Sequence, residues 1–320
     1  MSLPRREFLA LSATAGTSLL LSACAGTPSA ETLPASMAAC PAPHPRIKLG
    51  IATYSYWHFT KERPEITTVI DKAAALGVEG VDVLHRQMSS EDNAYLQNIK
   101  RHAFCNGIDL ICLSMHQNFV SADPDYRRKQ IDHTLGCIEL AYKMGIPCMR
   151  INAGRWNTRK SFDDLMAHRG EEPVPEGVTE DDGFKWAIDG ITQCLGKAAE
   201  CGVTLGLENH WGLSGTPEGM LRICNAANSP WLRLLVDTGN FLEDPYNKIE
   251  KVLPQTCYVQ AKTYQGGGEW YTLDLDYKRI FQQLRAVNYQ GYVGIEFEGK
   301  APADEAVAQS VQLLREAMRG

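Results

Sequence analysis

Eight short β-type runs alternate with longer helical stretches after residue 45, and this alternation limits the possible fold more than any other feature. The runs lie at 47–53, 80–84, 108–115, 147–152, 203–208, 232–237, 257–262 and 292–297. Strands that are separated by helices pair in parallel, and eight parallel strands close a (β/α)8 barrel. We therefore predict an α/β protein with a single (β/α)8 (TIM) barrel domain over residues 46–320.

Helical patterns fill the gaps between these runs. They lie at 64–76, 126–144, 184–201, 217–227, 246–253, 277–287 and 304–318. Gly77, Gly145 and Gly202 each follow a helical pattern, and glycine at that place can adopt the left-handed conformation that ends a helix. An open doubly wound sheet is the alternative. It lacks support, because no glycine-rich phosphate loop follows the first run, where Thr53–Trp57 stands instead.

The first 45 residues differ from the rest of the chain. Arg5 and Arg6 precede a weakly apolar run that extends to about residue 23. This run is too short and too polar for a transmembrane helix. The arginine pair resembles a twin-arginine (Tat) export signal. We therefore assign residues 1–23 to a signal peptide and expect a protein of the periplasm or cell envelope.

The signal peptide ends in a segment that resembles a bacterial lipobox, Leu21–Cys24. This resemblance implies that Cys24 is lipidated and is the only membrane attachment. A plain signal peptide that is cleaved near Ala23 is the alternative. Residues 24–45 are rich in Pro, Ala, Ser and Thr, which is typical of a flexible tether.

Charge argues against nucleic acid as a partner, and the spacing of the cysteines argues against disulfides. The net charge of −6 offers no basic surface for nucleic acid. Ten cysteines are scattered without a CxxC pair. We expect those in apolar surroundings to be buried thiols rather than disulfides. These are Cys105, Cys112, Cys137, Cys148, Cys194, Cys201, Cys224 and Cys257.

Oxygen-bearing side chains end four consecutive predicted strands, the fifth to the eighth. They are Glu208, Asp237, Gln260 and Glu296. The active site of such barrels lies at the carboxyl ends of the strands, so these side chains should meet. Converging carboxylates repel each other unless a cation neutralises them. The sequence therefore predicts a divalent-metal site. Its oxygen-only ligands favour Mn²⁺, with Mg²⁺ or Co²⁺ also suitable.

Each of these residues has another possible role. Glu208 could form a structural ion pair with Arg150 or His210. Asp237 could cap the turn that follows it, and Gln260 could only orient a ligand.

Further polar residues near the strand ends are candidates for catalysis. We expect Glu296 to face the barrel interior and Glu298 to face outward. His210 could act as an acid or base or hold a substrate hydroxyl. Lys262 could stabilise substrate oxygens, or it could pair with a carboxylate.

Candidate substrate-binding residues follow several strands. His116, Arg150 and Asn152 lie at the ends of the third and fourth runs, and aromatic faces suit sugar stacking. The tryptophans that follow strands are Trp57, Trp156, Trp211 and Trp270, of which Trp57 and Trp211 are the stronger candidates. The long irregular segment 153–182 is predicted to cover the catalytic face as a lid.

The motifs at these strand ends resemble one known family. Glu208–His210, Asp237–Asn240, Gln260–Lys262 and Ile295–Gly299 together resemble the xylose isomerase-like sugar phosphate isomerase/epimerase family, over essentially all of 46–320. The family commonly binds metal through Glu, Asp, His and Glu. The resemblance implies these roles for Glu208, Asp237, Gln260 and Glu296, with Gln260 in place of the commoner His. It also implies that Glu208 and Glu296 move a proton at a substrate carbon.

This ligand set suits enediolate chemistry. A metal chelated by a carbonyl and an adjacent hydroxyl acidifies the C–H bond between them, and a carboxylate serves as base. We expect a metal-dependent isomerase or epimerase of a sugar or keto-sugar in the periplasm. One alternative is a lyase or hydratase of 3-keto-glycosides that a partner oxidoreductase supplies. The other is a sugar-binding lipoprotein without catalysis.

Overall fold

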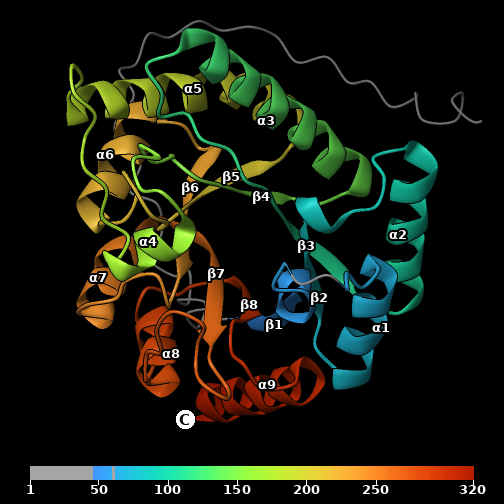
Figure 1. Cartoon of the computed structure of the whole chain (residues 1–320). Helices are drawn as coiled ribbons and strands as arrows, with labels where there is room; N and C mark the ends of the chain where they lie inside the picture. Colours follow the sequence, from blue (N-terminus) through green and yellow to red (C-terminus); the bar gives the residue numbers. More distant parts are fainter. Residues whose placement is uncertain (1–45, 60–61) are drawn as a thin grey trace, which may run out of the picture. The chain divides into compact units, whose positions relative to one another are not determined.

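The structure, a computed structural model, describes residues 46–59 and 62–320. The assigned signal peptide and tether lie outside these residues. Within the described part of the chain, eight parallel strands close into a barrel in the order β1 to β8, and helices surround it (Figure 1). The ring closes because β1 pairs with β8 as well as with β2. The predicted (β/α)8 barrel is confirmed, and this pairing excludes the open sheet.

The strands agree with the predicted runs to within one residue at each end. Their inner faces fill the barrel and their outer faces lie under helices, so nearly continuous apolar runs are required. In β2 all five residues are buried. The strands are β1 (Ile47–Ala52), β2 (Gly80–Leu84), β3 (Asp109–Ser114), β4 (Cys148–Ile151), β5 (Thr204–Glu208), β6 (Leu232–Asp237), β7 (Thr256–Thr263) and β8 (Gly291–Phe297).

The helices follow the predicted order, with two additions, α2 and α4. They are α1 (Ile66–Leu76), α2 (Asn93–Cys105), α3 (Pro124–Met144), α4 (Phe162–Ala167), α5 (Glu180–Cys201), α6 (Pro217–Ala227), α7 (Pro245–Val252), α8 (Tyr277–Ala286) and α9 (Ala303–Arg319). Short 3-10 turns are η1 (Thr53–Tyr56), η2 (His85–Gln87) and η3 (Leu253–Gln255). As predicted, Gly77, Gly145 and Gly202 end helices with left-handed φ values of 67°, 74° and 67°.

Two helices, α3 and α5, begin two or more residues earlier than predicted because polar residues cap them. The Asp123 side chain accepts a hydrogen bond from the backbone N–H of Asp125, so α3 begins at Pro124. Thr179 and Asp182 form a capping box at the start of α5. Such caps satisfy amide groups that have no partner in the first turn.

The cysteines within the described residues carry free thiols. Cys112, Cys137, Cys194 and Cys224 are buried, as predicted, whereas Cys105 is exposed, so that prediction was wrong there. Cys105 is the last residue of α2, on its outer side, where no packing layer covers it. Cys148, Cys201 and Cys257 are partly buried. None of the helices described is both long and apolar enough to cross a membrane.

Tyr258 packs inside the barrel beside Gly294 of β8. A Cβ atom on Gly294 would lie 1.9 Å from the Tyr258 hydroxyl oxygen and 2.9 Å from its Cζ. The rigid ring cannot move far, because it packs with Ile111, Cys112 and Leu235. Glycine at position 294 therefore gives the ring its space.

Gly294→Ala should lower the free energy of unfolding by about 1–3 kcal/mol, as overpacking of a filled core does. Gly136→Ala is the matched control, because a Cβ there meets no atom within 4 Å in α3. This control should gain about 0.5–1 kcal/mol from helix propensity. Urea unfolding of both variants is the measurement. Equal midpoints for the two variants would contradict the role of the glycine.

Candidate metal and substrate site

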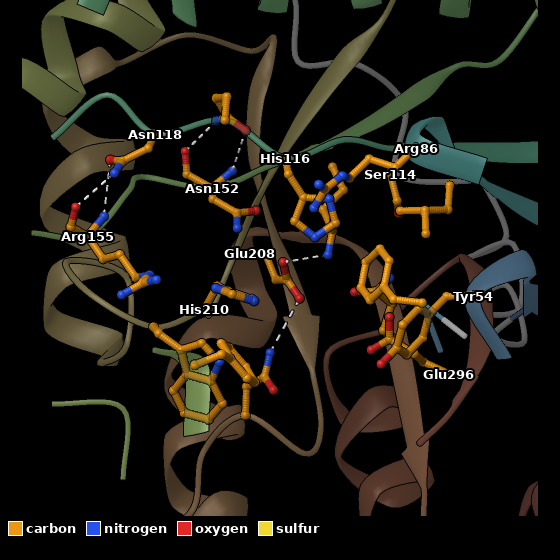
Figure 2. Close-up of a pocket in the computed structure, with 18 of the residues that line it drawn as sticks. Tyr54, Arg86, Ser114, His116, Asn118, Asn152, Arg155, Glu208, His210 and Glu296 are labelled. Carbon is orange, nitrogen blue, oxygen red and sulfur yellow. Dashed lines mark hydrogen bonds and ion pairs between the residues drawn. The ribbon is translucent and has the colours of Figure 1, made fainter. Parts of the chain in front are cut away.

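A cavity of about 1090 Å³ opens at the carboxyl ends of the strands. Figure 2 shows Glu208, His116 and Glu296 gathered around the same hollow. Side chains from most of the strand ends line it. They include Tyr54, Asp82, Arg150, His210, Asn240 and Lys262.

Three of the four predicted metal ligands, Glu208, Gln260 and Glu296, line the floor of this cavity. The fourth, Asp237, is buried beside Lys262 of the same floor. Glu208 and Asp237 are the last residues of β5 and β6. Asp237 is paired in register with Gln260 of β7, and Glu296 of β8 is paired with Lys262. All four are buried, with exposed fractions of 1%, 0%, 1% and 7% for Glu208, Asp237, Gln260 and Glu296.

Lys262 lies among three carboxylates of the floor. Its Nζ is 2.9 Å from Asp237 Oδ2, 3.3 Å from Glu296 Oε2 and 3.3 Å from Glu298 Oε2. It also donates a hydrogen bond to Asn240 Oδ1 at 3.0 Å. The prediction that Glu298 faces outward was wrong, since residues two apart on an extended chain share one side. The expected alternative for Lys262, an ion pair, is present.

Glu208 also has a cationic partner, as its alternative role predicts. Arg150 Nη1 donates to Glu208 Oε2 at 3.1 Å, and Arg150 Nη2 donates to the Met115 carbonyl. Asn240 Nδ2 donates to Glu208 Oε1 at 3.3 Å. Both carboxylate oxygens therefore have donors that hold the side chain in the cavity.

Asp237 divides its two oxygens between a turn and the floor. Oδ1 accepts a hydrogen bond from the backbone N–H of Gly239 at 2.8 Å, so the expected capping role is present. Oδ2 faces Lys262 in an ion pair and has no hydrogen-bond partner among the described residues. One oxygen thus fixes the side chain, and the other faces the ammonium group of Lys262.

The carboxylates of the floor do not all ionise easily. Burial raises the pKa of Asp237 well above its usual value, and Glu296 and Glu208 raise it further against the effect of Lys262. Burial also raises the pKa of Glu208, although Arg150 opposes this. For Glu296, burial acts to raise the pKa, but Lys262 and a hydrogen bond with Asp237 bring it below its usual value. The floor therefore has a surplus of negative groups that a further cation would relieve.

The donor set fits a hard divalent ion. Three carboxylates and one amide oxygen supply only oxygen atoms, which suits Mn²⁺ or Mg²⁺. Gln260 Oε1 is buried and, like Asp237 Oδ2, has no hydrogen-bond partner among the described residues. A bound ion would satisfy both atoms, so the residues present fit the metal that the fold implies.

Asp82 holds Gln260 in place. Gln260 Nε2 donates to Asp82 Oδ2 at 3.2 Å, which leaves Oε1 as the free end of the amide. Ser114 Oγ donates to both oxygens of Asp82, and the Tyr258 hydroxyl approaches Oδ2 at 3.4 Å. Asp82 was not predicted as a site residue. An acidic residue inside the apolar run of β2 was the available signal.

The predicted polar substrate residues line the cavity above the floor. His116, Arg150, Asn152 and His210 all belong to its wall. Arg150 Nε and Asn152 Oδ1 are buried without a hydrogen-bond partner in the described residues. Burial, followed by the charge of Arg150, lowers the pKa of both His116 and His210 well below the usual value. Both rings are therefore neutral at neutral pH and can exchange hydrogen bonds with hydroxyl groups.

The two tryptophans predicted to stack on a sugar differ in their position relative to the cavity. Trp211 lines the cavity, whereas Trp57 does not belong to its wall. The turn η1 directs Trp57 away, where it packs against Phe59 with ring centroids 4.9 Å apart. Tyr54 and His58 of the same segment line the cavity instead. They were missed because the path of a 3-10 turn is not visible in the sequence.

The segment 153–182 borders the cavity, where it was expected to act as a lid. Asn157, Phe162 and Met166 contribute to the wall. Phe162 packs against Trp270 at a centroid distance of 4.7 Å, and Trp270 Nε1 donates to Asp163 Oδ1 at 2.8 Å. Trp270 also lines the cavity, whereas Trp156 packs against Trp186 outside it.

Comparisons with known proteins agree with this fold. The family model described as xylose isomerase-like TIM barrel matches residues 70–317. No curated protein matches the chain by sequence. Among similar solved structures is D-psicose 3-epimerase from Clostridium cellulolyticum H10 with D-tagatose (TM-score 0.66, 16% identity, 85% of this chain and 99% of that chain).

Two further structures illustrate the range of relatives. One is 3-keto-D-glucoside 4-epimerase from E. coli in its apo form (TM-score 0.66, 18% identity, 85% of this chain and 100% of that chain). The other is D-allulose 3-epimerase from Methylomonas sp. (TM-score 0.65, 13% identity, 86% and 99%). At such identities the likeness shows the fold alone. The match of the family model over most of the barrel is decisive: the chain belongs to the xylose isomerase-like TIM barrel family.

Proposed function

We propose that the protein is a metal-dependent epimerase or isomerase that acts on a sugar or keto-sugar through an enediolate. One observation carries the proposal: Glu208, Gln260 and Glu296 line the cavity floor, and Asp237 is buried beside Lys262 of that floor. Two of their oxygens have no hydrogen-bond partner in the described part of the chain. The sugar epimerases among the similar structures support the carbohydrate class.

The residues of the floor and those of the wall have different roles in this reaction. A divalent ion, preferably Mn²⁺, held by the four ligands would make the C–H bond beside a chelated carbonyl more acidic. Glu208 and Glu296, on the separate strands β5 and β8, remove and return the proton. Lys262 balances the charge of the floor and stabilises substrate oxygens. The neutral rings of His116 and His210 hold hydroxyl groups.

Proton exchange in D₂O tests this proposal. The purified protein is freed of metal, reloaded with Mn²⁺, Mg²⁺ or Co²⁺, and incubated with keto-sugars while ¹H NMR follows the loss of carbon-bound hydrogen. We expect exchange that depends on the metal and that stops when a chelator removes it. Exchange that continues at full rate without metal would contradict the proposal.

The size of the cavity favours a second candidate, a lyase or hydratase of 3-keto-glycosides. Its volume of about 1090 Å³ lies just above the roughly 300–1,000 Å³ of pockets for drug-sized ligands, so a glycoside with its aglycone has room. A partner oxidoreductase would supply the 3-keto substrate. Release of 4-nitrophenol from a 3-keto-glucoside would establish this activity. Tight binding of sugars without exchange or release would instead favour a non-catalytic sugar-binding protein.

We further propose that the barrel domain, residues 46–320, works in the periplasm or cell envelope after Tat export. Cys24 would carry the lipid, with 24–45 as tether. Cys24→Ala should move the protein from the membrane pellet to the soluble fraction of lysed cells. Fractionation followed by immunoblotting measures this. If the parent protein and the variant are both soluble, Cys24 carries no lipid anchor.

A further inference from the structure

Three side chains with nitrogen and sulfur ligand atoms meet on the cavity rim, away from the carboxylate floor. His85 lies in η2, directly after β2, whereas His133 and Cys137 lie four residues apart on α3. One ligand atom from each lies within 4.8 Å of the others. Residues four apart share one side of a helix, so His133 and Cys137 both face His85.

The spacing of these atoms is close to that of a tetrahedral metal site. Cys137 Sγ lies 3.9 Å from His133 Nε2, and the rings of His85 and His133 are 5.4 Å apart between centroids. Zn²⁺ with bonds of about 2.3 Å to sulfur and about 2.0–2.1 Å to nitrogen holds its ligands roughly 3.3–3.7 Å apart. Small side-chain rotations would close the remaining difference.

Glu91 supports the first of the two imidazoles. Glu91 Oε1 lies 2.8 Å from His85 Nε2. A carboxylate that binds one ring nitrogen of a histidine fixes the ring and makes the other nitrogen a better metal ligand. The cluster thus contains an orienting group in addition to three ligands.

The position of the cluster leaves room for a fourth ligand. Cys137 is buried, His133 is exposed, and the side chain of His85 is 13% exposed. His85 and His133 both line the large cavity, together with Tyr126 and Gln130. A metal held there would have its thiolate ligand inside the protein and an open position toward water or a substrate oxygen.

The chemistry of the donors separates this cluster from the floor. The floor offers only oxygen atoms, which suit Mn²⁺ or Mg²⁺, whereas two imidazoles and a thiolate select Zn²⁺. We propose that His85, His133 and Cys137 form a second metal site, a Zn²⁺ site on the cavity wall. This inference does not depend on the proposed epimerase activity.

Cobalt substitution tests the site directly. Metal-free protein titrated with Co²⁺ should show a near-ultraviolet thiolate-to-cobalt charge-transfer band whose final intensity corresponds to one thiolate-bound Co²⁺ per chain. One equivalent of Zn²⁺ should remove this band. Cys137→Ser should abolish it, and Glu91→Gln should weaken Co²⁺ binding about 10–100-fold.

Two matched variants make the result specific. Cys194→Ser, at a buried cysteine whose thiol donates to the Gly190 carbonyl, should keep the band. Asp237→Asn, which damages the floor, should keep it as well. His133→Ala changes an exposed residue, so it should fold as the parent does in circular dichroism and still bind Co²⁺ at least tenfold more weakly. Absence of the band in folded parent protein, or its survival in Cys137→Ser, overturns the site.

Discussion

Glu296→Gln should reduce metal-dependent proton exchange on the substrate by about 10²–10⁴-fold, the contribution expected of a general base. The amide keeps the shape of the side chain but cannot take up a proton. Lys262 and Asp237 hold the pKa of Glu296 below its usual value against the effect of burial, so the carboxylate is ionised and ready to act. The rate of C–H exchange in D₂O, measured with saturating Mn²⁺, gives the comparison.

Glu298→Gln is the matched control for this prediction. Glu298 lies two residues further along, also pairs with Lys262, and accepts a hydrogen bond from the Tyr54 hydroxyl at 3.0 Å. Its loss should change exchange by less than the loss of Glu296, because it does not belong to the predicted ligand set. If Glu298→Gln stops exchange and Glu296→Gln does not, the proton-carrying role belongs to Glu298.

Lys262→Met should destabilise the metal-free protein by about 3–5 kcal/mol, because removal of one partner leaves buried charges without compensation. Burial acts to lower the pKa of Lys262, but Asp237, Glu298 and Glu296 raise it well above its usual value, so the ammonium is present. Saturating Mn²⁺ should raise the Tm of Lys262→Met more than that of the parent. In the parent, the ion has to share the carboxylates with the ammonium.

Lys197→Met is the control variant, because Lys197 also pairs with two carboxylates but lies at the protein surface. Lys197 pairs with Glu139 and Glu200 at the surface, and such pairs contribute little. Thermal unfolding with and without Mn²⁺ should therefore separate the two variants clearly. Equal Tm values for Lys262→Met and Lys197→Met in metal-free buffer would show that Lys262 does not hold the floor together.

The fold was predictable because the strands and most of the helices carry their own local signal. Apolar runs and helix-ending glycines located every strand and most helices. The helix α2 was missed because only Leu96, Ile99 and Ala103 are buried in it, too few to give a clear apolar pattern. The early starts of α3 and α5 depend on caps at Asp123 and Thr179, which act just outside the apolar pattern.

The site was predictable only in part, because its ligands mark strand ends but its partners depend on the closed barrel. Glu208, Asp237, Gln260 and Glu296 follow apolar runs, so the rule for strand ends found them. Asp82 hydrogen-bonds Gln260 across the barrel at a separation of 178 residues. Asn240 bridges Glu208 and Lys262 in the same way. Such contacts leave no periodic pattern in the sequence, so they could not be predicted from it.

Gln260, whose Nε2 donates to Asp82, offers an amide oxygen as a ligand rather than an imidazole nitrogen. A histidine ligand takes up a proton near pH 6.5 and then releases its metal, whereas an amide oxygen does not titrate in this range. A metal held through Gln260 would therefore lose no ligand to imidazole protonation as its surroundings acidify. The first ligand to be protonated in acid would instead be a carboxylate such as Asp237, whose pKa burial raises.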